Sequence, residues 1–303
     1  MITKRKLQLA AIAAFLGMIA AFVFVVTAPG ESKDVVASPE SGAQPAPTIT
    51  AGFKVEQYPA VPRQPSQVTL GDVPLAHYDS VISDVLAQDE VSPIETWKTA
   101  RPLAPLVALY SAMSKNADPI AALSHLTVED VTSVAVFGEY GTERADGGWL
   151  LVGTPSRKSL PTTDSTAPAV TFAYVRAADF EVGEIDRKVT VDTVTGEVQL
   201  IAKDGTVLHS ETGTLGSADD PTPHGWGYIT ATYTGGENAT SAGKSIALIS
   251  AHSEKRASYG ENGALTAIHY STSTRPTSFG CVRVSIAFTR LLEPLIGIPV
   301  MFE

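Results

Sequence analysis

The C-terminal part of the chain alternates apolar and polar residues with the two-residue period of β-strands. Residues 188–192, 198–202 and 206–210 show this period, and Gly196 and Gly205 lie in the turns that would separate them. This pattern predicts a three-stranded meander. Apolar runs of strand length follow, and we predict further strands at residues 227–233, 245–250, 265–270 and 298–302.

The middle of the chain has a less regular pattern. Short β-rich runs, separated by Gly and Pro, predict a small barrel or sandwich that loosely resembles SH3-like modules; they lie at residues 131–138, 147–152 and 170–175. Before them, apolar spacing and first-turn prolines predict short helices at residues 78–88, 102–115 and 119–126.

The N-terminal end has the composition of a membrane anchor followed by a linker. Three basic residues, 4–6, precede an apolar run long enough for one bilayer span. We therefore predict that residues 1–28 form a single-pass anchor in the cell membrane, with the basic flank in the cytoplasm and the catalytic part outside. Secretion after cleavage of a signal peptide is the alternative. Residues 29–75 are rich in Pro, Ser and Ala, which predicts a disordered linker.

Composition excludes several classes of function. Of the 303 residues, 44% are apolar and 18% are charged, as in an ordinary folded protein. The net charge of -10, without a basic stripe, argues against a nucleic-acid partner. The sequence shows neither a Cys/His cluster with metal-ligand spacing nor a Gly-rich phosphate loop, so we predict no metal and no cofactor. It makes no prediction of oligomeric state.

The strongest candidate for chemistry is the single cysteine, Cys281, which cannot form an internal disulfide. Ser285 is placed to cap a helix predicted over residues 286–292. A thiol shortly before a helix N-terminus and near a histidine is expected to ionise more readily than a free thiol. His269 is the expected proton acceptor, and His252 is the other histidine considered for a contact at the site.

Residues 187–303 resemble the catalytic domain of the L,D-transpeptidases (YkuD-like), a β-rich family that remodels peptidoglycan. The resemblance implies a mainly β catalytic domain with one late helix, preceded by a mixed helical and SH3-like module at residues 76–186. Five landmarks carry it, in the family's order: a hairpin at 192–205, PTPHGWGY at 221–228, AIH at 267–269, SFGCVR at 278–283 and GIPV at 297–300.

The resemblance also implies a reaction. Cys281 would attack a carbonyl of a stem tetrapeptide, release D-alanine and pass the acyl group to an amine of a neighbouring stem, giving a 3-3 cross-link. Water as the acceptor would give a carboxypeptidase. His269 would act as the base, and the backbone N–H groups of Gly280 and Cys281 would stabilise the oxyanion. Arg283 is expected to bind a substrate carboxylate or to hold the cysteine loop. Ser278 is expected to bond near the thiol or to shape the turn.

Two residues depart from the family pattern. Phe279 stands where the family usually has a histidine, and Tyr270 replaces the glycine that usually follows the catalytic histidine. These changes are expected to alter substrate preference and rate without removing the nucleophile or the base. The residues predicted to contact the oxyanion or the substrate are Gly280, Ser278, Arg283, Phe279, His252 and Tyr270.

Two other functions fit parts of the pattern. A sortase-like transpeptidase also depends on Cys, His and Arg, but its cysteine follows a different strand motif, whereas Cys281 follows Ser-Phe-Gly and precedes a predicted helix. A catalytically weak peptidoglycan-binding homologue is suggested by Phe279. The expected partners are peptidoglycan stem peptides and, through residues 1–28, the membrane.

Overall fold

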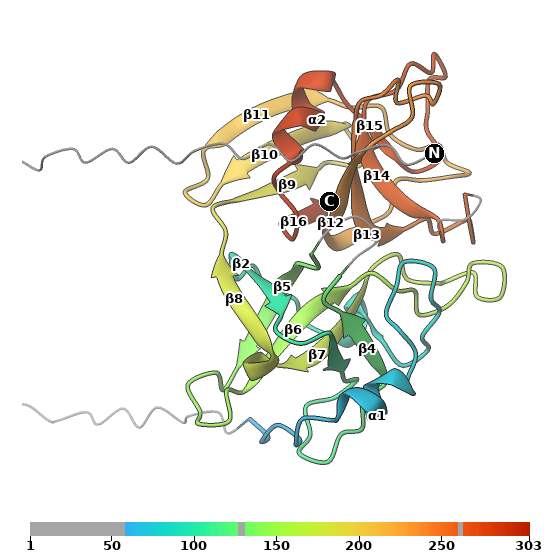
Figure 1. The fold of residues 1–303 in the computed structure, drawn as a ribbon. Helices are drawn as coiled ribbons and strands as arrows, with labels where there is room; N and C mark the ends of the chain where they lie inside the picture. The colour runs from blue at the N-terminus through green and yellow to red at the C-terminus, as the bar shows by residue number, and fades with distance from the viewer. Residues whose placement is uncertain (1–57, 127–130, 260–262) are drawn as a thin grey trace, which may run out of the picture. The chain divides into compact units, whose positions relative to one another are not determined.

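The computed structural model describes residues 58–126, 131–259 and 263–303, which are mainly β structure (Figure 1). The predicted fold class, mainly β with one late helix, is confirmed. The predicted anchor at 1–28 and the linker up to residue 57 lie outside the described residues. Within the described ranges, none of the helices has the length and apolar character needed to cross a membrane.

One sheet is built from six strands in the order β1-β7-β6-β5-β2-β8, and all of its neighbouring strands are antiparallel. The strands predicted at 131–138, 147–152 and 170–175 are β5, β6 and β7. The bounds are β1 Leu86–Ala87, β2 Lys98–Pro102, β5 Val134–Tyr140, β6 Trp149–Thr154, β7 Thr171–Arg176 and β8 Phe180–Glu184. A separate hairpin pairs β3 Leu106–Leu109 with β4 Ala121–Ser124.

The helices predicted at 78–88, 102–115 and 119–126 are wrong. These segments contain β1, β3 and β4. The two short 3-10 helices of the described residues are η1 Gln88–Glu90, directly after β1, and η2 Ala177–Asp179, between β7 and β8. The run at 107–110 is buried along its whole length, and the spacing of so short an apolar run does not distinguish a strand from a helix. Pro105 also disfavours helical geometry in the residue before it.

The predicted linker extends too far, because residues 58–75 pack on the six-stranded sheet. Trp149 Nε1 donates a hydrogen bond to the carbonyl of Pro59 at 2.9 Å, and Arg144 Nη1 donates to the carbonyl of Tyr58 at 2.5 Å. A short helix, α1 Gln67–Gly71, follows and is capped by the side chain of Ser66.

The second sheet has eight strands in the order β11-β10-β9-β16-β12-β13-β14-β15. The predicted meander is β9 to β11, and the strands predicted near 227, 245, 265 and 298 are β12, β13, β14 and β16. The closing strand β16 lies parallel to β9 and antiparallel to β12. The bounds are β9 Arg187–Val191, β10 Glu197–Ala202, β11 Val207–Thr212, β12 Gly225–Thr234, β13 Ser245–His252, β14 Leu265–His269, β15 Val282–Arg283 and β16 Pro299–Phe302.

One helix, α2 Ile286–Leu292, covers β13 and β14. As predicted, Ser285 is its N-cap, and the Ser285 side chain accepts a hydrogen bond from the N–H of Phe288. Phe288 and Leu292 are buried against the sheet. Both sheets contribute to one hydrophobic core, in which the rings of Phe137 and Trp226 meet edge to face at 5.9 Å.

Candidate active site

The cysteine and the predicted base lie on the same face of the eight-stranded sheet. β14 and β15 are parallel, with Ile268 opposite Val282 and His269 opposite Arg283. Because side chains alternate along strands, Ile268 and Val282 point into the core, where both are buried. Cys281, His269 and Arg283 therefore face the other way, and all three line a cavity of about 580 Å³.

Neighbouring strands and loops complete this Cys281 cavity. The same face continues across β13 and β12, which contribute Ile246, Leu248 and Tyr233. Loops close it on the other sides. The remaining lining residues are Ala239, Thr240, Ser241, Tyr259, Leu265, Ala267, Ser271, Ser273, Arg275, Ser278 and Phe279.

The backbone fixes the tautomer of His269. Its Nδ1 lies 2.7 Å from the carbonyl oxygen of Tyr270. A carbonyl only accepts hydrogen bonds, so Nδ1 carries the proton and Nε2 is the basic nitrogen. Burial lowers the pKa of His269, and the nearby positive charge of Arg283 lowers it further. The imidazole is therefore neutral at neutral pH and ready to accept a proton.

Cys281 differs from the sequence expectation in its protonation. The thiol is half-buried, and burial raises its pKa, although a hydrogen bond from the backbone N–H of Ala267 and the charge of Arg283 oppose this shift. The predicted easier ionisation is therefore wrong for the resting site. The reason is that α2 begins only after Ser285, beyond β15, whereas burial acts on the thiol itself. The resting pair is a thiol and a neutral imidazole.

Ser278 shapes the turn that carries the cysteine. Its hydroxyl donates to the carbonyl of Cys281 and accepts a hydrogen bond from the N–H of Gly280 at 3.1 Å. The backbone N–H of Ser278 donates to Leu215 at 2.7 Å. Of the two roles considered for Ser278, the structure supports the one in the turn.

Gly280 is required by the shape of this turn. Its φ is +105°, and a Cβ placed there would lie 3.1 Å from the carbonyl oxygen of Pro221 and 3.1 Å from the hydroxyl of Tyr259. The N–H of Gly280 is already bound to Ser278, so the structure does not leave it free to bind an oxyanion, as the sequence predicted. The N–H of Cys281 remains the candidate donor.

Three predicted site residues, Gly280, His252 and Tyr270, lie outside the cavity lining. His252 is 1% exposed, and its Nε2 lies 2.9 Å from the carbonyl of Tyr78. Burial and the charge of Arg157 lower the pKa of His252 to about 3, so it stays neutral as a structural residue. Tyr270 acts through its backbone carbonyl, which orients His269.

Phe279 and Arg283 line the cavity. Phe279 is 46% exposed, and its ring is stacked by the guanidinium groups of Arg256 and Arg275. Arg283 both lines the cavity and holds the loop, because its Nη1 donates to the carbonyl of Arg275 at 3.0 Å. The structure thus gives Arg283 the loop-holding role and places its charge beside Cys281 and His269.

Tyr259 also lines the cavity and was not predicted as a site residue. Its hydroxyl donates to the carbonyl of Phe279, and burial raises its pKa to about 12, with a further contribution from Cys281. Tyr259 therefore stays protonated and braces the peptide unit next to the cysteine. It lies in a polar loop without a periodic pattern, so no signal in the sequence pointed to it.

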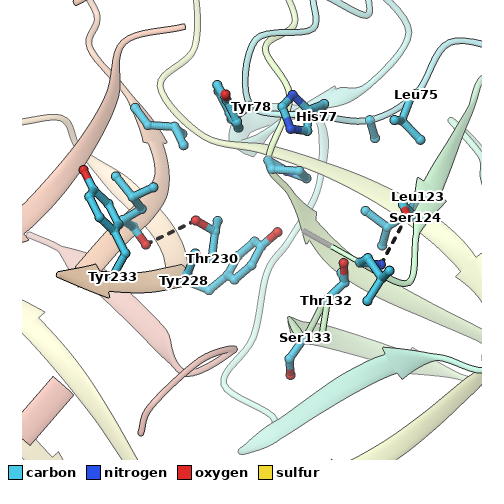
Figure 2. Close-up of a pocket in the computed structure, with 16 residues that line it drawn as sticks. Leu75, His77, Tyr78, Leu123, Ser124, Thr132, Ser133, Tyr228, Thr230 and Tyr233 are labelled. Atoms are coloured by element: carbon cyan, nitrogen blue, oxygen red, sulfur yellow. Dashed lines mark hydrogen bonds between the residues drawn. The ribbon is translucent and has the colours of Figure 1, made fainter. Parts of the chain in front are cut away.

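Figure 2 shows a second cavity, of about 420 Å³, lined by Tyr228 and Thr230 of β12, by Leu123 of β4 and by Thr132, which precedes β5. It shares Tyr233, Leu248 and Leu265 with the Cys281 cavity. Its lining residues include no Cys, Asp or Glu. In the described parts of the chain, no group of three His, Cys, Asp or Glu side chains could hold a metal ion.

No protein-family model matches this sequence, and no curated protein matches it. Among solved structures, an L,D-transpeptidase mutant from Enterococcus faecium is 20% identical, with a TM-score of 0.28 over 39% of this chain and 50% of that one. An L,D-transpeptidase from Stackebrandtia nassauensis is 17% identical, with a TM-score of 0.29 over 40% and 57% of the two chains. One from Mycobacterium smegmatis is 13% identical, with a TM-score of 0.29 over 56% and 99%.

This chain spans about half the length of the first two of these structures. At such low TM-scores, the assignment of function has to rest on the residues of this chain.

Arg283→Gln is expected to move the ionisation of Cys281 to higher pH, because the positive charge of Arg283 favours the thiolate. The chain has one cysteine, so alkylation by iodoacetamide followed by mass spectrometry reports on this thiol alone. The midpoint of the rate against pH should rise in Arg283→Gln. The control Arg290→Gln, on the exposed side of α2, should keep the wild-type midpoint. An unchanged or lower midpoint in Arg283→Gln contradicts the electrostatic role.

Proposed function

We propose that this protein is an L,D-transpeptidase that acts on peptidoglycan stem peptides through Cys281. The observation that carries the proposal is the shared cavity of Cys281 and His269, in which the tautomer of His269 leaves a basic Nε2. A nucleophile beside an oriented base is the arrangement that acyl transfer requires. The ordered sequence landmarks at 221–228, 267–269 and 278–283 support the substrate class.

In the acylation step, His269 Nε2 takes the proton of the Cys281 thiol as the sulfur attacks the carbonyl carbon of the stem peptide. The carbonyl oxygen becomes an oxyanion, which the N–H of Cys281 is placed to stabilise. The carbon–nitrogen bond then breaks, and the proton on His269 passes to the leaving amine of D-alanine. A thioester on Cys281 remains. General-base assistance is needed because the resting thiol is protonated.

In the second step, an amine of a neighbouring stem attacks the thioester carbonyl. His269 takes a proton from this amine and returns one to the departing sulfur, which restores the resting pair. The product is a cross-link between third residues. Water in place of the amine gives the carboxypeptidase reaction, with the same proton transfers.

The test uses a carbapenem and a tetrapeptide-stem muropeptide. Wild type should gain one carbapenem mass on Cys281, because the thiolate opens the lactam ring and stays acylated. With the muropeptide it should release D-alanine and form a dimer, and Cys281→Ala should do neither. Equal turnover by the two proteins would defeat the proposal. An unreactive thiol in wild type would favour the binding-only homologue.

The structure gives the sortase-like alternative less support. The arginine at a sortase-like spacing is Arg290, nine residues after Cys281, and it is exposed on α2 and outside the lining of the Cys281 cavity. Cleavage of the muropeptide between its third and fourth residues, and not of a protein sorting peptide, is the outcome that separates the two enzymes.

A further inference from the structure

The Cys281 cavity has an unusual charge for this protein. The chain carries a net charge of -10, yet the residues that line the cavity include Arg275 and Arg283 and no Asp or Glu. A cavity lined by charges of one sign concentrates ligands of the opposite sign. The site is thus suited to a substrate with a negative group near the scissile bond.

The arginines around Phe279 differ in their partners. Arg256 lies 4.5 Å from the ring centre of Phe279 and is bound on its other side by both carboxylate oxygens of Asp220, at 2.5 and 2.6 Å. Arg275 lies 5.4 Å from the same ring centre, and among the described residues no carboxylate forms an ion pair with it. Arg256 is therefore already neutralised, whereas Arg275 is the exposed cation at the edge of the cavity.

We infer that Arg275 binds a carboxylate of the substrate and makes the enzyme selective for stems that carry it. This inference rests on the proposed function and adds a specificity residue to it. A guanidinium matches a carboxylate through two parallel hydrogen bonds, which gives both affinity and orientation.

Two contacts hold Arg275 for this role. The ring of Phe279 provides a flat surface that restricts the Arg275 guanidinium before the substrate binds. Arg275 therefore loses less conformational entropy when the carboxylate binds. Arg283 Nη1 binds the backbone carbonyl of Arg275 and ties its loop to β15 next to the cysteine. Phe279, which stands where the family usually has a histidine, would thus position the Arg275 side chain.

A stem tetrapeptide whose third residue is a diamino diacid has two carboxylates close to the scissile bond. One is the terminal carboxylate of the leaving D-alanine, and the other is a side-chain carboxylate on the third residue. Both present the same chemistry to Arg275. Probes that differ in one carboxylate at a time separate them.

The experiment measures kcat/KM for release of the fourth residue from three synthetic tetrapeptides. One carries both carboxylates, one has the terminal carboxylate as an amide, and one has the side-chain carboxylate as an amide. Wild type should prefer the acid over one of the two amides by about 10- to 100-fold, as expected for loss of a charged hydrogen-bond pair. Arg275→Gln should reduce this preference to about twofold or less, whereas Arg275→Lys should keep part of it.

The matched control is Arg290→Gln, which should show the wild-type preference. A preference that survives in Arg275→Gln, or turnover of all three peptides at equal rates by wild type, overturns the role of Arg275 and leaves the proposed function intact. A wild-type protein that forms the carbapenem adduct on no residue and cleaves none of the peptides would instead refute the proposed function.

Discussion

His269→Gln is expected to slow acylation of Cys281 by about 10²- to 10⁴-fold, the usual contribution of a positioned general base. The effect is large because burial keeps the thiol protonated in the resting site. A glutamine side chain can fill the space beside β15, but it cannot take the proton of the thiol. The measurement is the rate of carbapenem acylation between pH 4 and 9. Subsaturating carbapenem gives the second-order rate constant, and saturating carbapenem gives the first-order rate constant of the bound complex.

The dependence of the acylation rate on pH also identifies the base. The imidazole works while neutral, so the wild-type rate should fall as pH decreases through the pKa of His269. That pKa is lowered by burial, so the fall should occur below 6.5, the ordinary value for a histidine. His269→Gln should lack this limb. His209→Gln is the matched control, because His209 lies on β11 beside Glu211 and outside the cavity. A His269→Gln rate within a few-fold of wild type would exclude the base role.

The sequence was sufficient to predict every strand of the eight-stranded sheet except β15, because their alternation and turn residues agree with how the sheet buries one face. The same logic placed Cys281 and His269 together only with help from the family resemblance, because strand periodicity does not say which strands become neighbours. The helices predicted before residue 126 failed for a related reason. Short apolar runs such as 107–110 are buried on both faces, and tertiary packing decides their conformation.

The loops of the site could not be predicted. Tyr259 and Arg275 lie in segments of polar residues, and each reaches the cysteine turn across a distance in sequence that local pattern does not encode. The prediction that Cys281 ionises easily was wrong for another reason. A sequence shows that a helix follows, but not how deeply the fold buries the thiol that precedes it.

Arg157 connects the segment that follows β6 to the loop that carries Tyr259. It follows β6 in sequence, is 1% exposed and donates to three carbonyls of the loop that carries Tyr259. Nε donates to Gly263 at 3.0 Å, and Nη2 donates to Ser253 at 3.0 Å and to Arg256 at 2.7 Å. Burial lowers the pKa of Arg157 to about 10, so the guanidinium is still charged at neutral pH.

Arg157→Met is therefore expected to lower the free energy of unfolding by about 3 to 5 kcal/mol, the range for removing one partner of a buried charged network. Methionine fills much of the volume, but it removes the donor from three carbonyls whose hydrogen bonds to Arg157 are buried or part-buried. Urea denaturation followed by intrinsic fluorescence measures the loss. Acylation of Cys281 by a carbapenem, measured under conditions where the variant is folded, should also slow, because Tyr259 loses the anchor of its loop.

Arg157→Lys separates the contribution of the positive charge from that of the three guanidinium hydrogen bonds. It keeps the positive charge but offers a single ammonium in place of the guanidinium fork, so it should recover part of the stability and less of the acylation rate. The exposed Arg290→Met should change stability by about 0.5 kcal/mol or less. If Arg157→Met unfolds at the wild-type urea concentration and acylates at the wild-type rate, the six-stranded sheet does not position the Tyr259 loop. The catalytic residues would then depend on the eight-stranded sheet alone.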